Sequence, residues 1–249
     1  MSRMLRAFTL LELLVVTAIL GLLVALLLPI LASARAAERN TRCIANLRGI
    51  GVAMTAYAVD NHAYLSPATN FGLWEKPVGT AVKTTDQTAY WGAAYVPYVG
   101  HFDRDPKRNV EAYQKDARSL WRCPASALIT GRVGFYTPNY YNPDQPATYG
   151  ANRLVTGRKL SQWVHPSTTI FCHDAPELMM EGKDDSLSNW GGAINFSQWR
   201  PGGSVYMPNA DREYYRHNKW SNVLWIDGHV SAVYESLGAD VPAAWYMGS

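Results

Sequence analysis

The chain has 249 residues, of which 48% are hydrophobic, 12% aromatic and 17% charged. This composition excludes intrinsic disorder, which goes with few aromatic and many charged residues, and it excludes a membrane protein with many spans. The net charge of +3 indicates no nucleic-acid partner, because it supplies no basic field for several phosphates. All nine Trp lie between Trp74 and Trp245, so these averages describe two different parts.

The first part of the chain is apolar over residues 10–31, which read LLELLVVTAILGLLVALLLPIL. As a helix this segment is long enough to cross about 30 Å of hydrocarbon, so it predicts a membrane span. The residues that interrupt it are Glu12, Thr17, Gly21 and Pro29. Because Arg3 and Arg6 precede it without an acidic residue, the positive-inside rule predicts a cytoplasmic N-terminus and an exported remainder.

A secretory signal peptide is the alternative, because Ala32-Ser33-Ala34 forms an acceptable cleavage site. Two features oppose it. The apolar run is longer than the usual signal core, and Glu12 places a carboxylate inside it, at a cost of about 2–3 kcal/mol near the membrane centre. A carboxylate in such a place indicates a function.

Residues 6–16, RAFTLLELLVV, resemble the prepilin cleavage and methylation signal of type IV pilins and type II secretion pseudopilins. The resemblance implies that prepilin peptidase cuts between Ala7 and Phe8 and methylates the new amino terminus of Phe8. Glu12 is then the fifth residue of the mature chain, and Pro29 is the twenty-second, where the family commonly has a Pro that kinks or loosens the helix. The family usually has Gly before the cut, where this chain has Ala7.

The signal also makes sense as an assembly device. A protonated amine at Phe8 is costly to place in lipid, and Glu12 of a neighbouring subunit neutralises it while setting the stagger between helices. The resemblance therefore implies a filament subunit whose partners are prepilin peptidase, other pilin-like subunits and an inner-membrane assembly platform. It implies a single-pass inner-membrane protein with a cytoplasmic N-terminus and a periplasmic head, which then enters a periplasmic or cell-surface filament.

The helix is expected to continue beyond the apolar run. After Leu31 the chain becomes polar, yet no Pro or Gly follows until Gly49. One amphipathic stripe then follows at three- and four-residue spacings, formed by Ile44, Leu47, Ile50, Met54 and Tyr57. We expect one helix from about Phe8 to about Asp60. The expected order is a leader at 1–7, a membrane and assembly helix at 8–34, its amphipathic continuation at 35–62, and a β-rich head at 63–249.

A more specific resemblance comes from residues 42–51, RCIANLRGIG, followed by Tyr57. They are similar to pilin-like proteins described as prepilin-type processing-associated, which carry a His, nine residues and then Asp-Gly near the C-terminus. That element is present here as His217, Asp227 and Gly228. Further matching pieces are Arg122-Cys123-Pro124, Tyr149-Gly150-Ala151-Asn152, His165-Pro166-Ser167 and Asn222-Val223-Leu224. The implied fold is α+β and pilin-like, with the helix packed on an antiparallel sheet; residues 68–119 and 176–214 are expected to be long loops.

The β-rich part contains four expected strands, at 168–172, 203–207, 221–226 and 229–234. Asp227-Gly228 between the last two runs predicts a hairpin with a type I′ turn, because both residues of that turn need positive φ. This gives a structural reading of the motif, in which Asp227 and Gly228 form the turn and His217 fixes the loop before the hairpin by a hydrogen bond.

A metal or catalytic site is the sharper alternative. Six residues of suitable type can meet on two strands, namely Cys172, His173, Asp174, His217, Asp227 and His229. Their spacing matches no metal motif, and no phosphate-binding loop or Gly-x-Ser-x-Gly element is present in the sequence. Residues 236–240 resemble the calcium loop of some pseudopilins, without its later acidic ligands. We therefore expect a structural protein rather than an enzyme, with no cofactor; calcium or another bound metal is the open alternative.

Three Cys permit three pairings, and an exported domain favours oxidation. The family resemblance favours Cys43 with Cys123, because both lie in matching pieces, and closing that loop stabilises by about 4 kcal/mol in the chain-entropy model. Cys172 is then a buried thiol. Three free thiols are the alternative.

The Trp residues allow two interpretations. Most are expected to fill the core of a small sheet domain, as Trp225 does inside the hairpin. Trp190 and Trp199 flank Gly191-Gly192 in a polar loop and are the better candidates for ligand binding. They support the competing function, a secreted or membrane-anchored glycan-binding protein or hydrolase that uses the His, Asp and Trp residues of the head.

Overall fold

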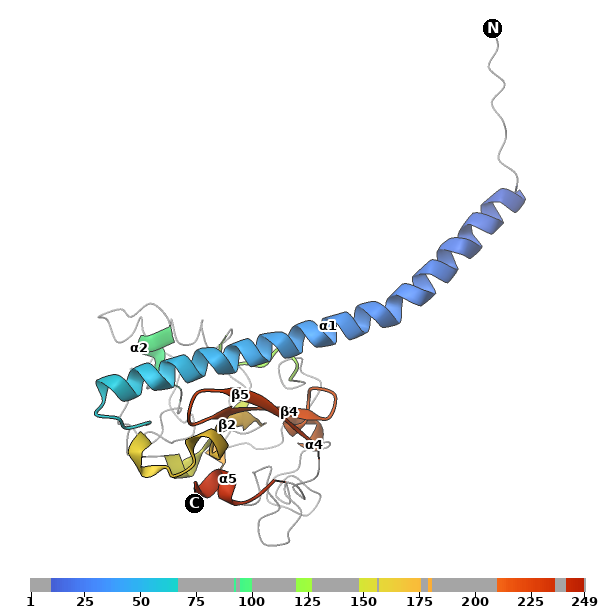
Figure 1. Ribbon diagram of the computed structural model, residues 1–249. Coiled ribbons are helices and arrows are strands. Elements are labelled where there is room, and N and C mark those ends of the chain that lie inside the picture. Colours follow the sequence, from blue (N-terminus) through green and yellow to red (C-terminus); the bar gives the residue numbers. More distant parts are fainter. Residues whose placement is uncertain are drawn as a thin grey trace, which may run out of the picture. The chain divides into compact units, whose positions relative to one another are not determined.

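The computed structural model describes residues 10–66, 92, 95–99, 120–126, 148–155, 157–175, 179–180, 210–235 and 241–248 (Figure 1). The described residues belong to two compact units, Met1–Arg39 and Asn40–Ser249. Helix α1 (Leu10–Asp60) contributes to both units. The predicted helix is therefore confirmed from Leu10 onward, while Phe8 lies outside the described residues.

The first unit consists of the apolar part of α1. Every described residue from 10 to 39 is exposed, and the large apolar side chains are exposed by between 46% at Val16 and 81% at Leu10. Pro29 lies inside the helix, which continues through it although Pro has no N–H to donate. By length and composition, α1 is able to cross a membrane.

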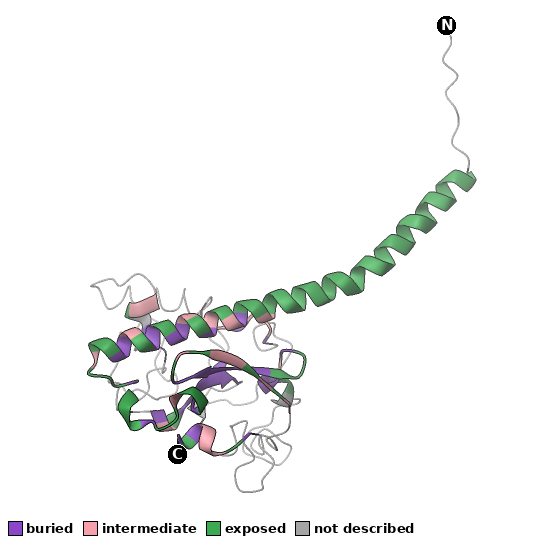
Figure 2. Cartoon of the chain, in the orientation of Figure 1, coloured by how far each residue is buried: buried purple, intermediate pink, exposed green. Residues whose placement is uncertain are grey.

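The second half of α1 belongs to the folded domain and buries one face there, which Figure 2 shows as the purple positions of this helix. The buried apolar side chains on this face are Cys43, Leu47, Ile50, Ala53, Met54, Tyr57 and Ala58. They form one core with Tyr149, Phe171 and Leu224. Of the predicted stripe, Ile44 alone is half-buried rather than buried. The apolar periodicity of the sequence therefore predicts correctly which face of α1 packs in the core.

The end of α1 matches the expected position. His62 and Ala63 adopt positive φ angles of 54° and 67°, which the helix cannot continue through. The N–H of Ala63 donates to the carbonyl of Ala58 at 2.8 Å, and this satisfies one of the last carbonyls of the helix.

The sheet of the folded domain has the strand order β3-β1-β2-β4-β5. The strands are β1 (Tyr149–Asn152), β2 (Ile170–Asp174), β3 (Met179–Met180), β4 (Trp220–Trp225) and β5 (Val230–Tyr234). The pairs β1–β2, β2–β4 and β4–β5 are antiparallel, as expected. The pair β1–β3 is parallel, so the sheet is mixed at this side. The expected α+β arrangement is confirmed, with α1 packed on the sheet.

The predicted type I′ turn is wrong. Four residues, Ile226 to His229, lie between β4 and β5, and the 3.0 Å bond from the Trp225 N–H to the His229 carbonyl closes a three-residue loop, Ile226 to Gly228, within them. Within this loop only Gly228 has a positive φ, at 91°, whereas a type I′ turn needs two such residues. The three-residue loop instead uses a single left-handed glycine. The strands therefore begin and end one residue away from the predicted bounds, except at Tyr234.

Several elements depart from the expected pattern. Strand β1 was not expected, and β2 begins at Ile170 because the short 3-10 helix η4 (Pro166–Thr168) precedes it. Short helices α2 (Val96–Val99) and α4 (Ala210–Tyr214) lie inside the segments predicted as loops. Helix α5 (Ala244–Met247) follows the hairpin and is held by Asn152, whose amide donates to the carbonyl of Tyr246 at 2.8 Å. The expected strand at 203–207 lies outside the described residues.

The hairpin turn touches α1 at Gly51. A Cβ added there would lie 3.2 Å from the carbonyl oxygen of Gly228 and 2.9 Å from Cδ1 of Leu224. Only a glycine lets the helix and the backbone of the turn approach so closely. Gly228 therefore has a packing role against the helix.

Replacing Gly51 with Ala is expected to lower the free energy of unfolding by about 1–3 kcal/mol, because overpacking outweighs the better helix propensity of Ala. Gly49→Ala is the matched control on the same helix. A Cβ at position 49 would meet Cδ1 of Leu120 at 2.7 Å, and this flexible side-chain end can turn away. Thermal unfolding of the two variants measures the difference; equal midpoints would contradict the packing role of Gly51.

Candidate functional site

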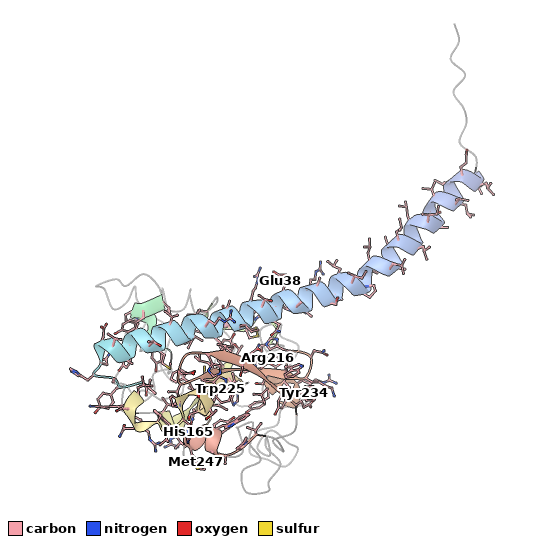
Figure 3. All side chains as sticks on the ribbon, in the orientation of Figure 1. Glu38, His165, Arg216, Trp225, Tyr234 and Met247 are labelled. Atoms are coloured by element: carbon pink, nitrogen blue, oxygen red, sulfur yellow. A yellow bond between two sulfur atoms is a disulfide. The ribbon has the colours of Figure 1, made fainter. Side chains whose placement is uncertain are left out.

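The His-x9-Asp-Gly element falls into two separate places. Asp227 and His229 form an exposed pair at the hairpin turn, with 2.6 Å between Oδ1 of Asp227 and Nδ1 of His229. The His229 ring stacks on Trp225, the last residue of β4 and labelled in Figure 3. His217 instead lies before β4 and is buried. The hairpin pair and His217 therefore belong to different environments.

His217 faces a carboxylate and a disulfide. Its Nε2 lies 3.2 Å from Oδ2 of Asp174 and 3.3 Å from Sγ of Cys123. Cys123 is joined to Cys43 of α1 by a disulfide, which is the pairing that the family resemblance favours. A carboxylate and a disulfide sulfur both lack a proton to donate, so Nε2 of His217 carries the proton in this state. We call Cys43, Cys123, His217 and Asp174 the His217 cluster.

Backbone contacts hold the disulfide segment in place. The Asn46 amide of α1 donates to the carbonyl of Arg122 at 2.9 Å. The N–H of Cys123 donates to the Thr148 hydroxyl at 2.6 Å, and that hydroxyl donates to the carbonyl of Trp121 at 3.2 Å. Cys123 is therefore fixed from two sides by groups other than its own sulfur.

Buried charges surround the cluster. Arg216, labelled in Figure 3, precedes His217 in the chain, and its Nε lies 3.9 Å from Oδ1 of Asp174. Its Nη2 lies 3.7 Å from Oε2 of Glu213, which accepts a 2.7 Å bond from the Ser126 hydroxyl. The side chains of Arg216, Glu213 and Asp174 are exposed by 4% or less. Such a network is stable only while each charge keeps its partners.

The network contains buried polar atoms that are not satisfied. Oδ2 of Asp174 accepts a 2.7 Å bond from the N–H of Asn222, whereas Oδ1 has no hydrogen-bond partner among the described residues. Nη1 of Arg216 and Oδ1 of Asn222 are also buried without a hydrogen-bond partner among the described residues. Unpaired buried polar atoms are uncommon in folded proteins and indicate a group or water that completes them.

His173 lies next to Asp174 but has different partners. Its Nδ1 donates to the carbonyl of Asp174 at 2.7 Å, and its Nε2 accepts from the hydroxyl of Tyr246 at 2.8 Å. Burial lowers the pKa of His173 to about 4, so its imidazole is neutral at pH 7. This histidine is satisfied within the domain and has no nitrogen free for a metal.

Cys172 is a buried free thiol in the core, as expected, and burial raises its pKa well above the ordinary value. A thiol of raised pKa is a poor nucleophile and a poor metal ligand. The alternative of a joint site of six residues is therefore not formed. The structure brings together Asp174 and His217, and it places Cys172, His173 and the Asp227–His229 pair in other contacts.

The His217 cluster does not have the arrangement of a nucleophile, a base and an orienting carboxylate. In such a triad the nucleophile and the carboxylate bind opposite nitrogens of the imidazole. Here Oδ2 of Asp174 and Sγ of Cys123 both approach Nε2, and Cys123 is in a disulfide. Three ligand-type atoms, from Cys43, Cys123 and His217, lie within 4.8 Å of one another. Two of these atoms are the bonded sulfurs of the disulfide, so the cluster in this state suits a structural role rather than proton transfer.

Sequence reasoning missed Arg216, Glu213 and the position of Cys123 beside His217. The available signal was that Cys123 and His217 both lie in matching family pieces. Ala7, Phe8, Trp190, Trp199 and residues 236–240 lie outside the described residues. Glu12 lies in the first turn of α1.

The geometry thus offers two features for function, the exposed apolar half of α1 and the buried His217 cluster. The first suits a membrane or a second helix, and the second suits a structural role. No protein-family model, curated protein or solved structure matches the chain.

Proposed function

We propose that the protein is a structural subunit of a filament like the type IV pilus or the type II secretion pseudopilus. Prepilin peptidase cuts it between Ala7 and Phe8, and an inner-membrane platform assembles it with other pilin-like subunits through α1. The precursor spans the inner membrane once, with a cytoplasmic N-terminus and a periplasmic folded domain. It serves no catalytic reaction and needs no cofactor for assembly.

The observation that carries the proposal is the exposed apolar surface of α1. All described residues from 10 to 39 are exposed, and the large apolar side chains among them are not covered by any other part of the chain that the structure describes. Contiguous apolar surface of this extent marks a membrane or protein contact. Lipid covers it in the precursor, and neighbouring copies of the helix cover it in a filament.

Glu12 supports a filament over a plain anchor. It lies in the first turn of α1, where a carboxylate is favoured by the helix dipole. The amine that cleavage exposes at Phe8 gives this carboxylate a partner of opposite charge on a neighbouring subunit. The pair fixes the axial register of two helices that are otherwise uniformly apolar.

The disulfide supports an exported domain. Cys43 and Cys123 are joined in the folded domain, and such bonds persist in oxidising compartments. The positive charges at Arg3 and Arg6 orient the chain so that this domain leaves the cytoplasm. The disulfide and the predicted membrane topology therefore support the same location for the folded domain, outside the cytoplasm.

The mature N-terminus tests this function directly. Mass spectrometry of the membrane-bound protein, expressed with a prepilin peptidase, is expected to find N-methylated Phe8 as the first residue. Expression without the peptidase should leave Met1 in place, and Ala7→Gly should give the same mature product as the wild type. A mature chain that begins at Arg35 would show a signal peptide, and an intact Met1 in the presence of the peptidase would show a plain anchor.

A further inference from the structure

An exposed aromatic pair ends the β4–β5 hairpin on the side away from its turn. Trp220, the first residue of β4, is paired with Tyr234, the last residue of β5, and their rings meet edge to face with centroids 5.0 Å apart. Their exposed fractions are 42% and 49%, whereas Trp225 at the turn end of β4 is only 5% exposed. Figure 3 labels Trp225 and Tyr234, which mark the two ends of the hairpin. Aromatic side chains with a polar tip suit a boundary between an apolar and an aqueous phase.

A tight turn holds this pair in place. Asn218 and Lys219 have positive φ angles of 53° and 72°. The N–H groups of His217 and Trp220 each donate to the carbonyl of the other residue at 3.2 Å, which closes a two-residue turn. The N–H of Glu235 donates to the carbonyl of Lys219 at 2.8 Å and extends the strand pairing to the end of the hairpin. A left-handed Lys persists only where surrounding contacts fix it, so the backbone at the aromatic pair is well defined.

The aromatic pair lies at the end of the folded domain where α1 enters it. The side-chain amide of Asn222, two residues after Trp220, donates to Oδ1 of Asn40, the first residue of the second unit. At the other end of β4, the turn packs on Gly51. Moving along β4 from the turn to Trp220 therefore follows α1 toward its N-terminus. Trp220 also shares a face of the sheet with Asn222, since side chains two residues apart in a strand point to the same side.

The distance from the apolar run fits the thickness of a lipid head-group layer. Asn40 follows Leu31, the last residue of that run, by nine residues of the same helix. Nine helical residues span about 14 Å, whereas head groups occupy about 5–8 Å outside the hydrocarbon. Trp220 lies two strand residues beyond Asn222 in the same direction, which is about 7 Å. The rings therefore reach the head groups when α1 spans a bilayer.

Basic side chains at this end favour lipid over a second copy of the chain. The side chain of Lys219 is 66% exposed, with Glu235 at 3.6 Å, and Arg42 is exposed in α1 two residues after Asn40. Trp and Tyr mark membrane interfaces, and basic side chains are attracted to anionic lipid. A symmetric contact between two copies would instead bring the same basic groups together.

We propose that Trp220, Tyr234, Lys219 and Arg42 form an interfacial anchor, which holds the folded domain on the phospholipid head groups of the membrane that α1 spans. The rings enter the head-group layer, and the two basic side chains lie near lipid phosphates. The inference rests on the membrane span of the proposed function and adds which end of the domain contacts lipid. It does not depend on filament assembly.

The experiment places one fluorophore beside the aromatic pair of the full chain. Ala232→Cys takes the label, because Ala232 is exposed and lies two residues before Tyr234 on the same face of β5. Without reductant the native cysteines do not compete, since Cys43 and Cys123 are bonded and Cys172 is buried. The labelled chain is reconstituted in vesicles of equal parts phosphatidylcholine and phosphatidylglycerol. The phosphatidylcholine carries bromine close to the head group, and its quenching of the fluorophore is measured.

The label at position 232 is expected to be quenched, and the double variant Trp220→Ser, Tyr234→Ser should lose this quenching. Val164→Cys is the matched control, because Val164 is 71% exposed and close to Pro166, whose carbonyl accepts the N–H of Asp227 in the turn. Its label should stay unquenched. In vesicles of phosphatidylcholine alone, the ratio of docked to undocked domain should fall by about fivefold or more, the effect of one basic side chain at an anionic surface.

A label at Leu20→Cys separates the two ways in which the experiment can fail. Leu20 lies in the apolar run, so lipid brominated deep in its chains should quench this label. If this label is quenched while the label at position 232 is not, the span stands and the interfacial anchor is refuted. If neither is quenched, the span fails and the anchor fails with it. Equal quenching at positions 232 and 164, or quenching that survives the loss of both rings, also refutes the anchor.

Discussion

Replacing Asp174 with Ala is expected to lower the free energy of unfolding of the folded domain by about 3–5 kcal/mol in the disulfide-bonded protein. The Asp174 carboxylate is fully buried, accepts the N–H of Asn222, and lies 3.9 Å from Nε of Arg216. Its loss leaves a buried guanidinium with Glu213 as its remaining carboxylate neighbour. Since the free energy of unfolding of a domain is about 5–15 kcal/mol in total, the variant retains only a fraction of its stability.

Asp227→Ala is the matched control for this experiment. It removes a side chain of the same type, but from the exposed pair with His229. Exposed ion pairs contribute about 0–1 kcal/mol to the free energy of unfolding. Urea unfolding of the detergent-solubilised protein, followed by tryptophan fluorescence, compares the two variants at pH 7. A loss below about 1 kcal/mol for Asp174→Ala would contradict the role of the buried network.

Replacing Glu12 with Ala is expected to leave membrane insertion intact and to abolish ordered assembly. The amine of Phe8 then enters the apolar helix contact without its carboxylate. An unpaired buried charge costs about 3–5 kcal/mol, so the association constant for each subunit falls by about 100-fold or more. Electron microscopy of sheared filaments and fractionation of membranes measure assembly and insertion separately.

Glu38→Ala is the control on the same helix. Glu38, labelled in Figure 3, lies in α1 beyond the apolar run, where its charge faces water. This variant should assemble like the wild type. Normal filaments from Glu12→Ala would refute the proposed register, and failure of both variants to insert would place the effect in the membrane step.

The sequence predicts α1 well because two independent signals agree. The apolar run and then the three- and four-residue spacing continue without a helix breaker, and the left-handed pair His62 and Ala63 ends the helix near the expected residue. Strand β1 gives no such signal. Tyr149-Gly150-Ala151-Asn152 is buried at every position, so its side chains show no alternation, and Gly and Asn are poor strand formers.

The candidate site is harder to predict because it depends on contacts between distant segments. Successive side chains of a strand point to opposite faces of the sheet. Asp174 therefore points toward α1, as its neighbour Asn222 does. His173, which precedes Asp174, points to the other face and contacts Tyr246. That alternation separates His173 from Asp174, while Asp227 and His229 lie apart in the hairpin turn. Cys123 lies beside His217 because a loop and the disulfide to Cys43 place it there. The hydrophobic periodicity of the sequence does not predict such a contact.

The contact between Gly51 and the turn at Gly228 also fixes the rotational setting of α1 on the sheet. The carbonyl oxygen of Gly228 would lie 3.2 Å from a Cβ at this position. If the helix turned by one residue, the side chain of Ile50 or Val52 would meet this oxygen, and neither fits in the space of a hydrogen atom. The small glycine therefore allows the hairpin turn to pack against α1 at only one rotation of the helix about its axis.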